Sequence, residues 1–225
     1  MKKIIDFDIY GLVPVDGGFL YIKPEMTASG KTKVGFYGYD VRSDKTVPVT
    51  KWVYLESKLG PAFKEISVQL KDYVSCDAAM LSNRHAALIY PDGDLGIFGI
   101  KGTAIWTGTL KYRGQSVCGI APVGTDFWSV VPSLNAIVCY STAENRVQMR
   151  IGGDNSTAFL KPEAVIKYDR RLFVSCSESC KVRAVSLDDY SVSDYLTFEE
   201  PVYKYFIAAE QEFVKLKSGI YILEA

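Results

Sequence analysis

Histidine is almost absent from this sequence: among 225 residues there is one, His85. A zinc site would therefore have to draw on scattered cysteines, and a Ser-His-Asp or Cys-His catalytic set would have to use His85. Because His85 follows Arg84 at an expected hairpin, we interpret it as a surface residue. The motifs G-x-S-x-G and G-x-x-x-x-G-K-[ST] are also missing. We expect no metal and no cofactor.

Excess charge and long apolar runs are lacking as well. The 26 basic residues balance 26 acidic ones, whereas binders of nucleic acid or of anionic membranes need a basic surplus. No apolar run approaches the roughly 20 residues of a membrane-spanning helix. Asp6 and Asp8 interrupt the apolar stretch after Lys2 and Lys3, unlike the core of a signal peptide. We expect a cytoplasmic monomer that binds neither nucleic acid nor membrane.

The five cysteines cannot all pair within one chain, because their number is odd. Most lie in or beside apolar runs, as buried free thiols do. The spacing of Cys176 and Cys180 is C-x3-C, which differs from the C-x-x-C of redox and zinc sites. We therefore predict that all are free thiols, namely Cys76, Cys118, Cys139, Cys176 and Cys180.

Short apolar runs rich in Val, Ile, Phe, Tyr and Trp are abundant and are separated by turn residues. Such runs predict strands, for example at 19–22, 87–90, 127–131 and 172–176. One segment differs: between 61 and 74 the apolar residues recur at helical spacing behind Pro61. The sequence therefore predicts an all-β protein with one amphipathic helical insertion near 61–74.

The expected strands recur with a period. Pro91 and Pro132 close equivalent strands, and Phe173 and Phe213 hold equivalent positions, so that three of the four spacings between units fall at 40–45 residues. The remaining spacing, between Pro24 and Pro91, is longer because it contains the expected helix. Five units of four strands predict a five-bladed β-propeller with antiparallel blades. The last unit has three strands, and the N-terminal run 2–6 can supply its fourth and close the ring. A β-sandwich would not need hairpins at a constant period, and a solenoid would have shorter repeats.

These units imply one domain over residues 1–225. We expect the blades at 8–57, 76–112, 115–153, 162–198 and 201–225 with 1–7, and the helical insertion at 58–75. Loops between blades, and between second and third strands, should share one face of the ring. They are the segments 23–33, 56–60, 111–115, 152–161 and 198–201.

One stretch, 150–174, is similar to the NHL-type propeller repeat. A Gly-Gly pair is followed by Phe and Pro, an apolar strand, a turn and a second strand, as in Arg150-Ile151-Gly152-Gly153, Phe159, Pro162 and 172–174. The Asp that such repeats commonly carry after the second strand is absent. The resemblance implies a propeller whose loops are presented to ligands. The blade number is also similar to that of tachylectin-like lectins and five-bladed glycosidases.

Aromatic residues are frequent, with 15 Tyr, 11 Phe and 3 Trp, and most should pack between blades. Four loop residues are candidates for binding instead: Tyr112, Arg113, Asp154 and Lys161. They combine an aromatic surface with both signs of charge, which suits a polar ligand or a protein hot spot. We therefore predict a non-catalytic binding or scaffold protein that presents this face to a protein or carbohydrate partner.

A propeller hydrolase, similar to a glycosidase or lactonase, is the alternative. Glycosidases use paired carboxylates, and four acids lie at the edges of the expected innermost strands: Asp8, Asp77, Glu163 and Glu210. In an enzyme these acids should gather around the central channel with raised pKa values. The sequence leaves the question of catalysis open, with a non-catalytic role favoured.

Overall fold

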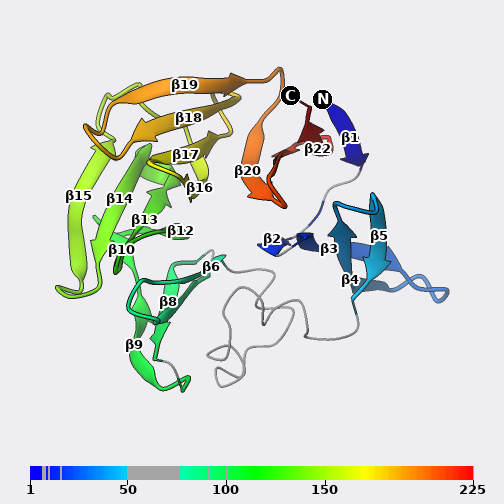
Figure 1. The fold of residues 1–225 in the computed structure, drawn as a ribbon, viewed down its shortest axis with the longest axis horizontal. Helices are drawn as coiled ribbons and strands as arrows, with labels where there is room; N and C mark the ends of the chain where they lie inside the picture. The colour runs from blue at the N-terminus through cyan, green and yellow to red at the C-terminus, as the bar shows by residue number, and fades with distance from the viewer. Residues whose placement is uncertain are drawn as a thin grey trace.

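The computed structural model describes residues 1–6, 9, 11–15, 17–49, 77–90, 92–99 and 101–224. Five four-stranded antiparallel sheets surround a common axis and form a five-bladed β-propeller (Figure 1). This confirms the all-β class and the number of blades. The expected helix at 61–74 lies outside the described residues. Within the described ranges the only helical turn is η1 (Pro132–Leu134), and no helix there could cross a membrane.

Each blade is a meander whose first strand lies nearest the axis (Figure 1). Blade 1 contains β2 (Gly11–Val15), β3 (Gly18–Met26), β4 (Thr32–Asp40) and β5 (Lys45–Pro48). Blade 2 contains β6 (Asp77–Met80), β7 (Ala86–Ile89), β8 (Asp94–Phe98) and β9 (Ala104–Thr109). Blade 3 contains β12 (Cys118–Val123), β13 (Asp126–Val131), β14 (Ala136–Ser141) and β15 (Arg146–Gly152).

Blade 4 contains β16 (Pro162–Tyr168), β17 (Arg171–Cys176), β18 (Lys181–Ser186) and β19 (Val192–Thr197). Blade 5 contains β20 (Val202–Ala208), β21 (Gln211–Leu216), β22 (Gly219–Leu223) and β1 (Lys2–Ile5). A small extra hairpin, β10 (Lys111–Tyr112) and β11 (Gln115–Ser116), projects between blades 2 and 3.

Blade 1 departs from the expectation in its second half. The segment 23–33 was expected as a long loop, but β3 and β4 remain paired as far as Met26 and Thr32, so the turn spans only 27–31. The extended parts of β3 and β4 contain charged residues such as Lys23, Glu25 and Lys33. They lack the apolar pattern that predicts a strand, because a projecting hairpin needs no apolar face. The fourth strand, β5, occupies Lys45–Pro48, whereas the sequence predicted it at 49–55, and β5 is exposed throughout. Residues 50–55 of that expected strand, and the loop at 56–60, lie outside the described part of the chain.

Among the described residues the apolar core consists of five clusters, and each lies between two neighbouring blades. Val13 of blade 1 packs with Leu88 of blade 2, and Ile97 of blade 2 packs with Phe127 of blade 3. The same arrangement joins blades 3 and 4, blades 4 and 5, and blades 5 and 1. Aromatic residues fill the last of these interfaces, where the Phe19 ring meets that of Phe206 edge-on at 5.2 Å.

The N-terminal strand closes the ring, as predicted. β1 pairs antiparallel with β22, with Lys2 opposite Ile222 and Ile5 opposite Ile220. Ile5 is 3% exposed and belongs to the cluster between blades 5 and 1. β1 therefore covers the edge of the last sheet, an edge that would otherwise offer unpaired backbone groups for aggregation.

Replacing Ile5 by alanine should destabilise the protein. Removing a buried isoleucine side chain from a packed interface costs about 2–5 kcal/mol, so the midpoint of urea unfolding should fall clearly. Lys2→Ala, in the same strand but with an exposed side chain, is the control and should have little effect. Equal stability of Ile5→Ala and wild type would show that β1 does not hold the ring closed.

The face that carries the blade-joining loops

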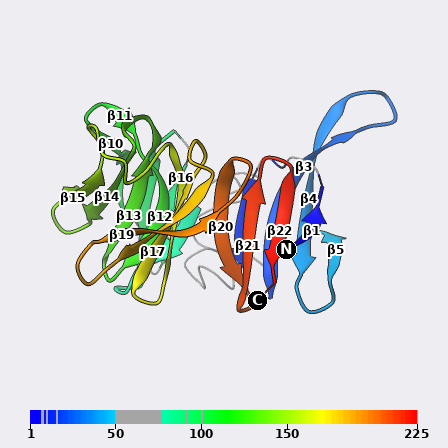
Figure 2. The ribbon, with the colours of Figure 1, turned by 90° about the horizontal axis from the view of Figure 1, so that it is seen from above.

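The two faces of the propeller are built from different connections. Because strands alternate in direction, the blade-to-blade loops and the second-to-third-strand turns lie on one face, which we call the joining face. The first-to-second and third-to-fourth turns lie on the other, which we call the hairpin face. The β10–β11 and β3–β4 hairpins rise on the same side of the ring (Figure 2), as this assignment requires.

Arg113 lies at the tip of the β10–β11 hairpin. Lys111 pairs with Ser116 and Tyr112 with Gln115, so the turn contains only Arg113 and Gly114. Both turn residues have positive φ, 51° and 77°, as in the two-residue turns that match the twist of antiparallel strands. The guanidinium carbon of Arg113 lies 5.6 Å from the ring centre of Tyr112.

Asp154 joins this hairpin to the next blade connection. Its Oδ2 accepts hydrogen bonds from Nη1 of Arg150 at 2.6 Å and from Nη1 of Arg113 at 3.1 Å. These two guanidinium groups, Arg150 first, hold the pKa of Asp154 below its usual range. Asp154 also contributes most to the raised pKa of Arg150, to which Tyr112 adds a smaller electrostatic contribution.

The Gly-Gly pair of the sequence positions Asp154. Gly152 has a φ of 80°, and a Cβ at this position would lie 2.6 Å from the backbone oxygen of Asn135 and 2.8 Å from the ring of Phe159. A side chain at 152 would therefore push the loop off the blade. Gly153 N–H donates to the same Asn135 oxygen at 2.9 Å, which fixes the start of the loop.

Lys161 lies at the other end of the same loop. Its backbone N–H donates to Oδ1 of Asn135 at 2.8 Å, so Asn135 holds both ends of 152–161. The structure thus brings Tyr112, Arg113 and Asp154 into direct contact, with Lys161 attached through Asn135. The sequence analysis did not include Arg150 among the candidate site residues. Its position four residues before Asp154 was the sequence feature that could have indicated an ion pair between them.

A cavity of about 380 Å³ opens at the centre of the ring. The first strands of all five blades contribute to it, together with residues that follow second strands. It is lined by Gly11, Leu12, Asp77, Ile89, Tyr90, Cys118, Gly119, Pro132, Glu163, Ala164, Tyr203, Lys204 and Lys215. Since these residues lie at the beginnings of first strands and the ends of second strands, the cavity is on the joining face.

Two of the four expected channel acids line this cavity. Asp77 accepts a hydrogen bond from Nζ of Lys204 at 2.7 Å, and Lys204 also donates to the backbone oxygen of Leu12. Glu163 accepts from Oγ of Ser177 at 2.7 Å. Glu210 is not in the channel: it lies in the β20–β21 turn and lines a separate surface depression. Asp8 lies outside the described residues.

Glu163 connects the cavity to the cluster on the joining face. Its Oε1 lies 3.8 Å from Nζ of Lys161, and Lys161 ends the loop that carries Asp154. The cavity itself contains two acids and two lysines, so its charges balance. In the part of the chain that the structure describes, no three His, Cys, Asp or Glu residues are grouped so that they could hold a metal ion.

Cys118 lies in the wall of the same cavity. Burial, with smaller contributions from Asp77 and Glu163, raises the pKa of its thiol to about 12. Burial likewise raises the pKa of Cys139 and of Cys176 to about 11. The four cysteines of the described ranges are free, and Cys76 lies outside them.

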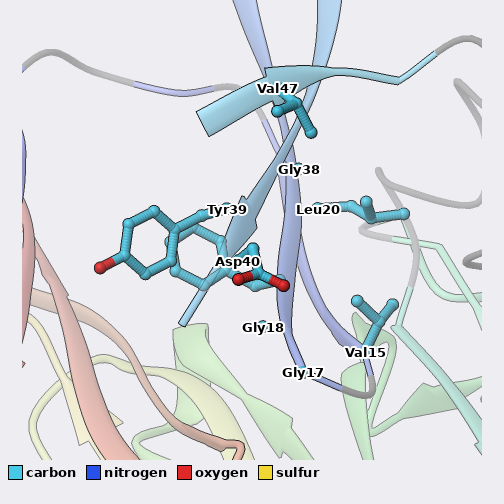
Figure 3. Close-up of a pocket in the computed structure, with 9 residues that line it drawn as sticks. Val15, Gly17, Gly18, Leu20, Gly38, Tyr39, Asp40 and Val47 are labelled. Atoms are coloured by element: carbon cyan, nitrogen blue, oxygen red, sulfur yellow. The ribbon is translucent and has the colours of Figure 1, made fainter. Parts of the chain in front are cut away.

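A second pocket, in blade 1, is too small for a ligand. It has a volume of about 20 Å³ and is enclosed by the β2–β3 turn and by residues such as Tyr39, Asp40 and Val47 (Figure 3). A space of this size accommodates about one water molecule. On the joining face, the candidate site consists of the central cavity and the neighbouring residues Tyr112, Arg113, Arg150 and Asp154.

Comparisons with known proteins support the fold. No family model and no curated protein matches the chain. Among solved structures, virginiamycin B lyase from Staphylococcus aureus is similar, with a TM-score of 0.53 and 11% identity over 93% of this chain and 77% of that one. Sqt1 from Saccharomyces cerevisiae is also similar, with a TM-score of 0.54 and 11% identity over 96% of this chain and 71% of that one.

The WD40 repeats of RRP9 give a TM-score of 0.50 and 12% identity over 93% of this chain and 59% of that one. These likenesses place the chain among β-propeller proteins, and at such identities they concern the fold alone. They do not test the similarity of 150–174 to NHL repeats, which stays a prediction.

Lys204 should contribute to stability through its bond to Asp77. The side chains of the pair are 15% and 24% exposed, and Lys204→Met leaves the Asp77 carboxylate without its cation. The loss of a charged hydrogen bond costs about 1–3 kcal/mol, measurable by urea unfolding. Lys33→Met is the matched control, because Lys33 is 62% exposed in its pair with Glu25. Equal effects of the two substitutions would contradict the structural role of Lys204.

The thiol pKa values predict a loss of stability at alkaline pH. Buried thiols with pKa values of about 11 to 12 keep their protons when folded, whereas unfolded thiols lose them from pH 9 upward. The stabilisation is complete below pH 9, and above it each thiol lowers the free energy of unfolding by up to about 1.4 kcal/mol per pH unit. Urea titrations between pH 8 and 10.5 should show a shallower decline for Cys118→Ala. Identical declines for variant and wild type would refute this.

Proposed function

We propose that this protein is a non-catalytic binding or scaffold propeller whose joining face docks a protein partner. The observation that carries the proposal is the cluster of Tyr112, Arg113, Arg150 and Asp154. It is assembled from the β10–β11 hairpin, the end of β15 and the loop that follows β15. The side chains of Arg113 and Asp154 are 53% and 60% exposed to solvent. We call this set the arginine–tyrosine cluster.

The chemistry of the arginine–tyrosine cluster favours a protein over a carbohydrate partner. Tyrosine and arginine are enriched among the residues that dominate the energy of protein interfaces. A guanidinium has five N–H donors in a planar fork, and both arginines meet Asp154 through Nη1. The cluster can therefore present further donors to carboxylates or backbone oxygens of a partner without breaking its own ion pairs.

The central cavity extends this surface. A partner that covers the arginine–tyrosine cluster also reaches the cavity, because Lys161 and Glu163 link the two. The cavity presents both signs of charge, from Lys204 and Asp77, and the aromatic ring of Tyr203. We propose that it receives a polar side chain of the partner as an anchor.

A hydrolase is the second candidate, because Asp77 and Glu163 line one cavity. The similar solved structures include an enzyme, virginiamycin B lyase. Both acids, however, already engage partners in the chain itself, Lys204 and Ser177. Each of these bonds uses one carboxylate oxygen, Oδ1 of Asp77 and Oε1 of Glu163, and gives the acid a structural role within the chain. The side chains of Arg113 and Asp154 are more exposed to solvent than those of the two acids, and for this reason we favour binding.

The test compares two double variants that match in residue type. Tyr112→Ala with Arg113→Ala removes the centre of the cluster, and Tyr168→Ala with Arg170→Ala makes the same change on the hairpin face, where both side chains are exposed. Two hot-spot truncations cost about 2–4 kcal/mol of binding, so capture of the partner protein should fall at least about tenfold for the first variant only.

Stability should barely change in either variant, since surface substitutions usually stay within about 0.5 kcal/mol. Affinity capture followed by quantitative mass spectrometry measures the ratio of each captured protein between variants and wild type. Capture that is equal for the two folded double variants would refute docking on the joining face. Hydrolysis of a substrate that is abolished by Glu163→Gln would instead support the second candidate.

A further inference from the structure

A cavity of about 310 Å³ lies between blades 2 and 3, on the hairpin face. It is formed by the turns before β7 and β13, by the β14–β15 turn and by the outer strand β9. We call it the inter-blade cleft. Its lining residues are Asn83, His85, Ile97, Ile105, Trp106, Thr125, Thr142, Ala143 and Asn145. It shares no residue with the central cavity, which opens on the opposite face.

The inter-blade cleft differs chemically from the joining face. None of its nine lining residues is Asp, Glu, Lys or Arg, although such residues make up 23% of the sequence. Its polar groups are amides, hydroxyls and one imidazole, all able to donate or accept hydrogen bonds. No lysine or arginine lines the cleft to pair with a phosphate or carboxylate, so the cleft suits an uncharged polar ligand.

One wall of the cleft is the indole of Trp106. A Cβ on Gly108 would lie 2.9 Å from two ring atoms of Trp106, so the absence of a side chain at 108 leaves room for the indole beside β9. The opposite neighbour is Tyr140, with ring centres 6.4 Å apart. The indole is thus held in place by its surroundings and is only partly buried.

The polar groups of the cleft are also held in place. Ser82 N–H donates to the backbone oxygen of Gly124, which ties the turns of blades 2 and 3 together. Oδ1 of Asn83 accepts from the backbone N–H of His85 at 3.1 Å. Oδ1 of Asn145 accepts from the hydroxyl of Tyr140 at 3.3 Å. Because both amide oxygens already accept hydrogen bonds within the chain, Asn83 and Asn145 can contact a ligand through their NH2 groups, as donors.

We propose that the inter-blade cleft binds a neutral saccharide. A sugar ring has an apolar C–H face, which can lie against the Trp106 indole, and hydroxyl groups, which can pair with the amides of Asn83 and Asn145. The volume is at the lower end of the roughly 300–1,000 Å³ of ligand pockets, as expected for one sugar unit. Exposed Ile105 (53%) extends the apolar wall toward solvent.

The experiment uses the full chain and an array of neutral, sialylated and sulfated glycans, followed by calorimetry with the best neutral glycan. We expect wild type to bind neutral glycans, Trp106→Ala to lose at least tenfold in affinity, and Trp106→Phe to keep part of it. Asn83→Asp should also weaken binding at least fivefold, because it keeps the oxygen that the turn needs and removes the NH2 group.

Tyr112→Ala with Arg113→Ala, on the joining face, is the control and should bind glycans as wild type does. This separates the cleft from the proposed docking of a protein, so either proposal can fail alone. The inference is overturned if wild type binds no glycan on the array, if it binds only anionic ones, or if folded Asn83→Asp and Trp106→Phe both bind as wild type does. Asn83→Asp keeps the test decisive should Trp106→Ala fail to fold.

Discussion

Each blade of this propeller is apolar on both faces, and neither face can be buried until a neighbouring blade lies against it. In the part of the chain that the structure describes, the five core clusters are accordingly the five interfaces between blades, and no sheet there has a core of its own. Every interface therefore depends on a closed ring. The closing contact is made by four residues at the N-terminus, where Ile5 enters the interface between blades 5 and 1. The blades can therefore bury their apolar faces only if the ring is closed.

This distribution of the core leaves the connections between strands free to vary. Phe159 of the 152–161 loop is 1% exposed and packs between blades 3 and 4, but loop side chains outside the core can be charged at small cost. The positions of these charges are nevertheless well defined, because backbone geometry supports them. Arg113 stands on a two-residue turn with Gly114, and Asp154 follows a Gly-Gly pair that packs against Asn135.

The two faces then differ in chemistry as well as in construction. On the joining face the arginine–tyrosine cluster and the central cavity combine acids, bases and aromatic rings, an arrangement suited to a protein surface. On the hairpin face the inter-blade cleft combines an indole with amides and hydroxyls, and no charged residue lines it. One propeller can carry both surfaces, because the loops that form the joining face differ from the turns that form the hairpin face.

The sequence by itself determined the fold class, the number of blades and the closing strand, because period, alternation and turn residues are local properties that every blade repeats. It also placed Tyr112, Arg113 and Asp154 on one face, since loop positions follow from strand count. Only the tertiary structure decided which residues meet. Asp77 and Lys204 are 127 positions apart and pair across the channel, whereas the carboxylate residue Glu210 lies in the β20–β21 turn, away from the channel. Trp106 of blade 2 and Asn145 of blade 3 line one cleft because the two blades pack there. Contacts between blades depend on how the ring closes, and local sequence patterns do not contain this information.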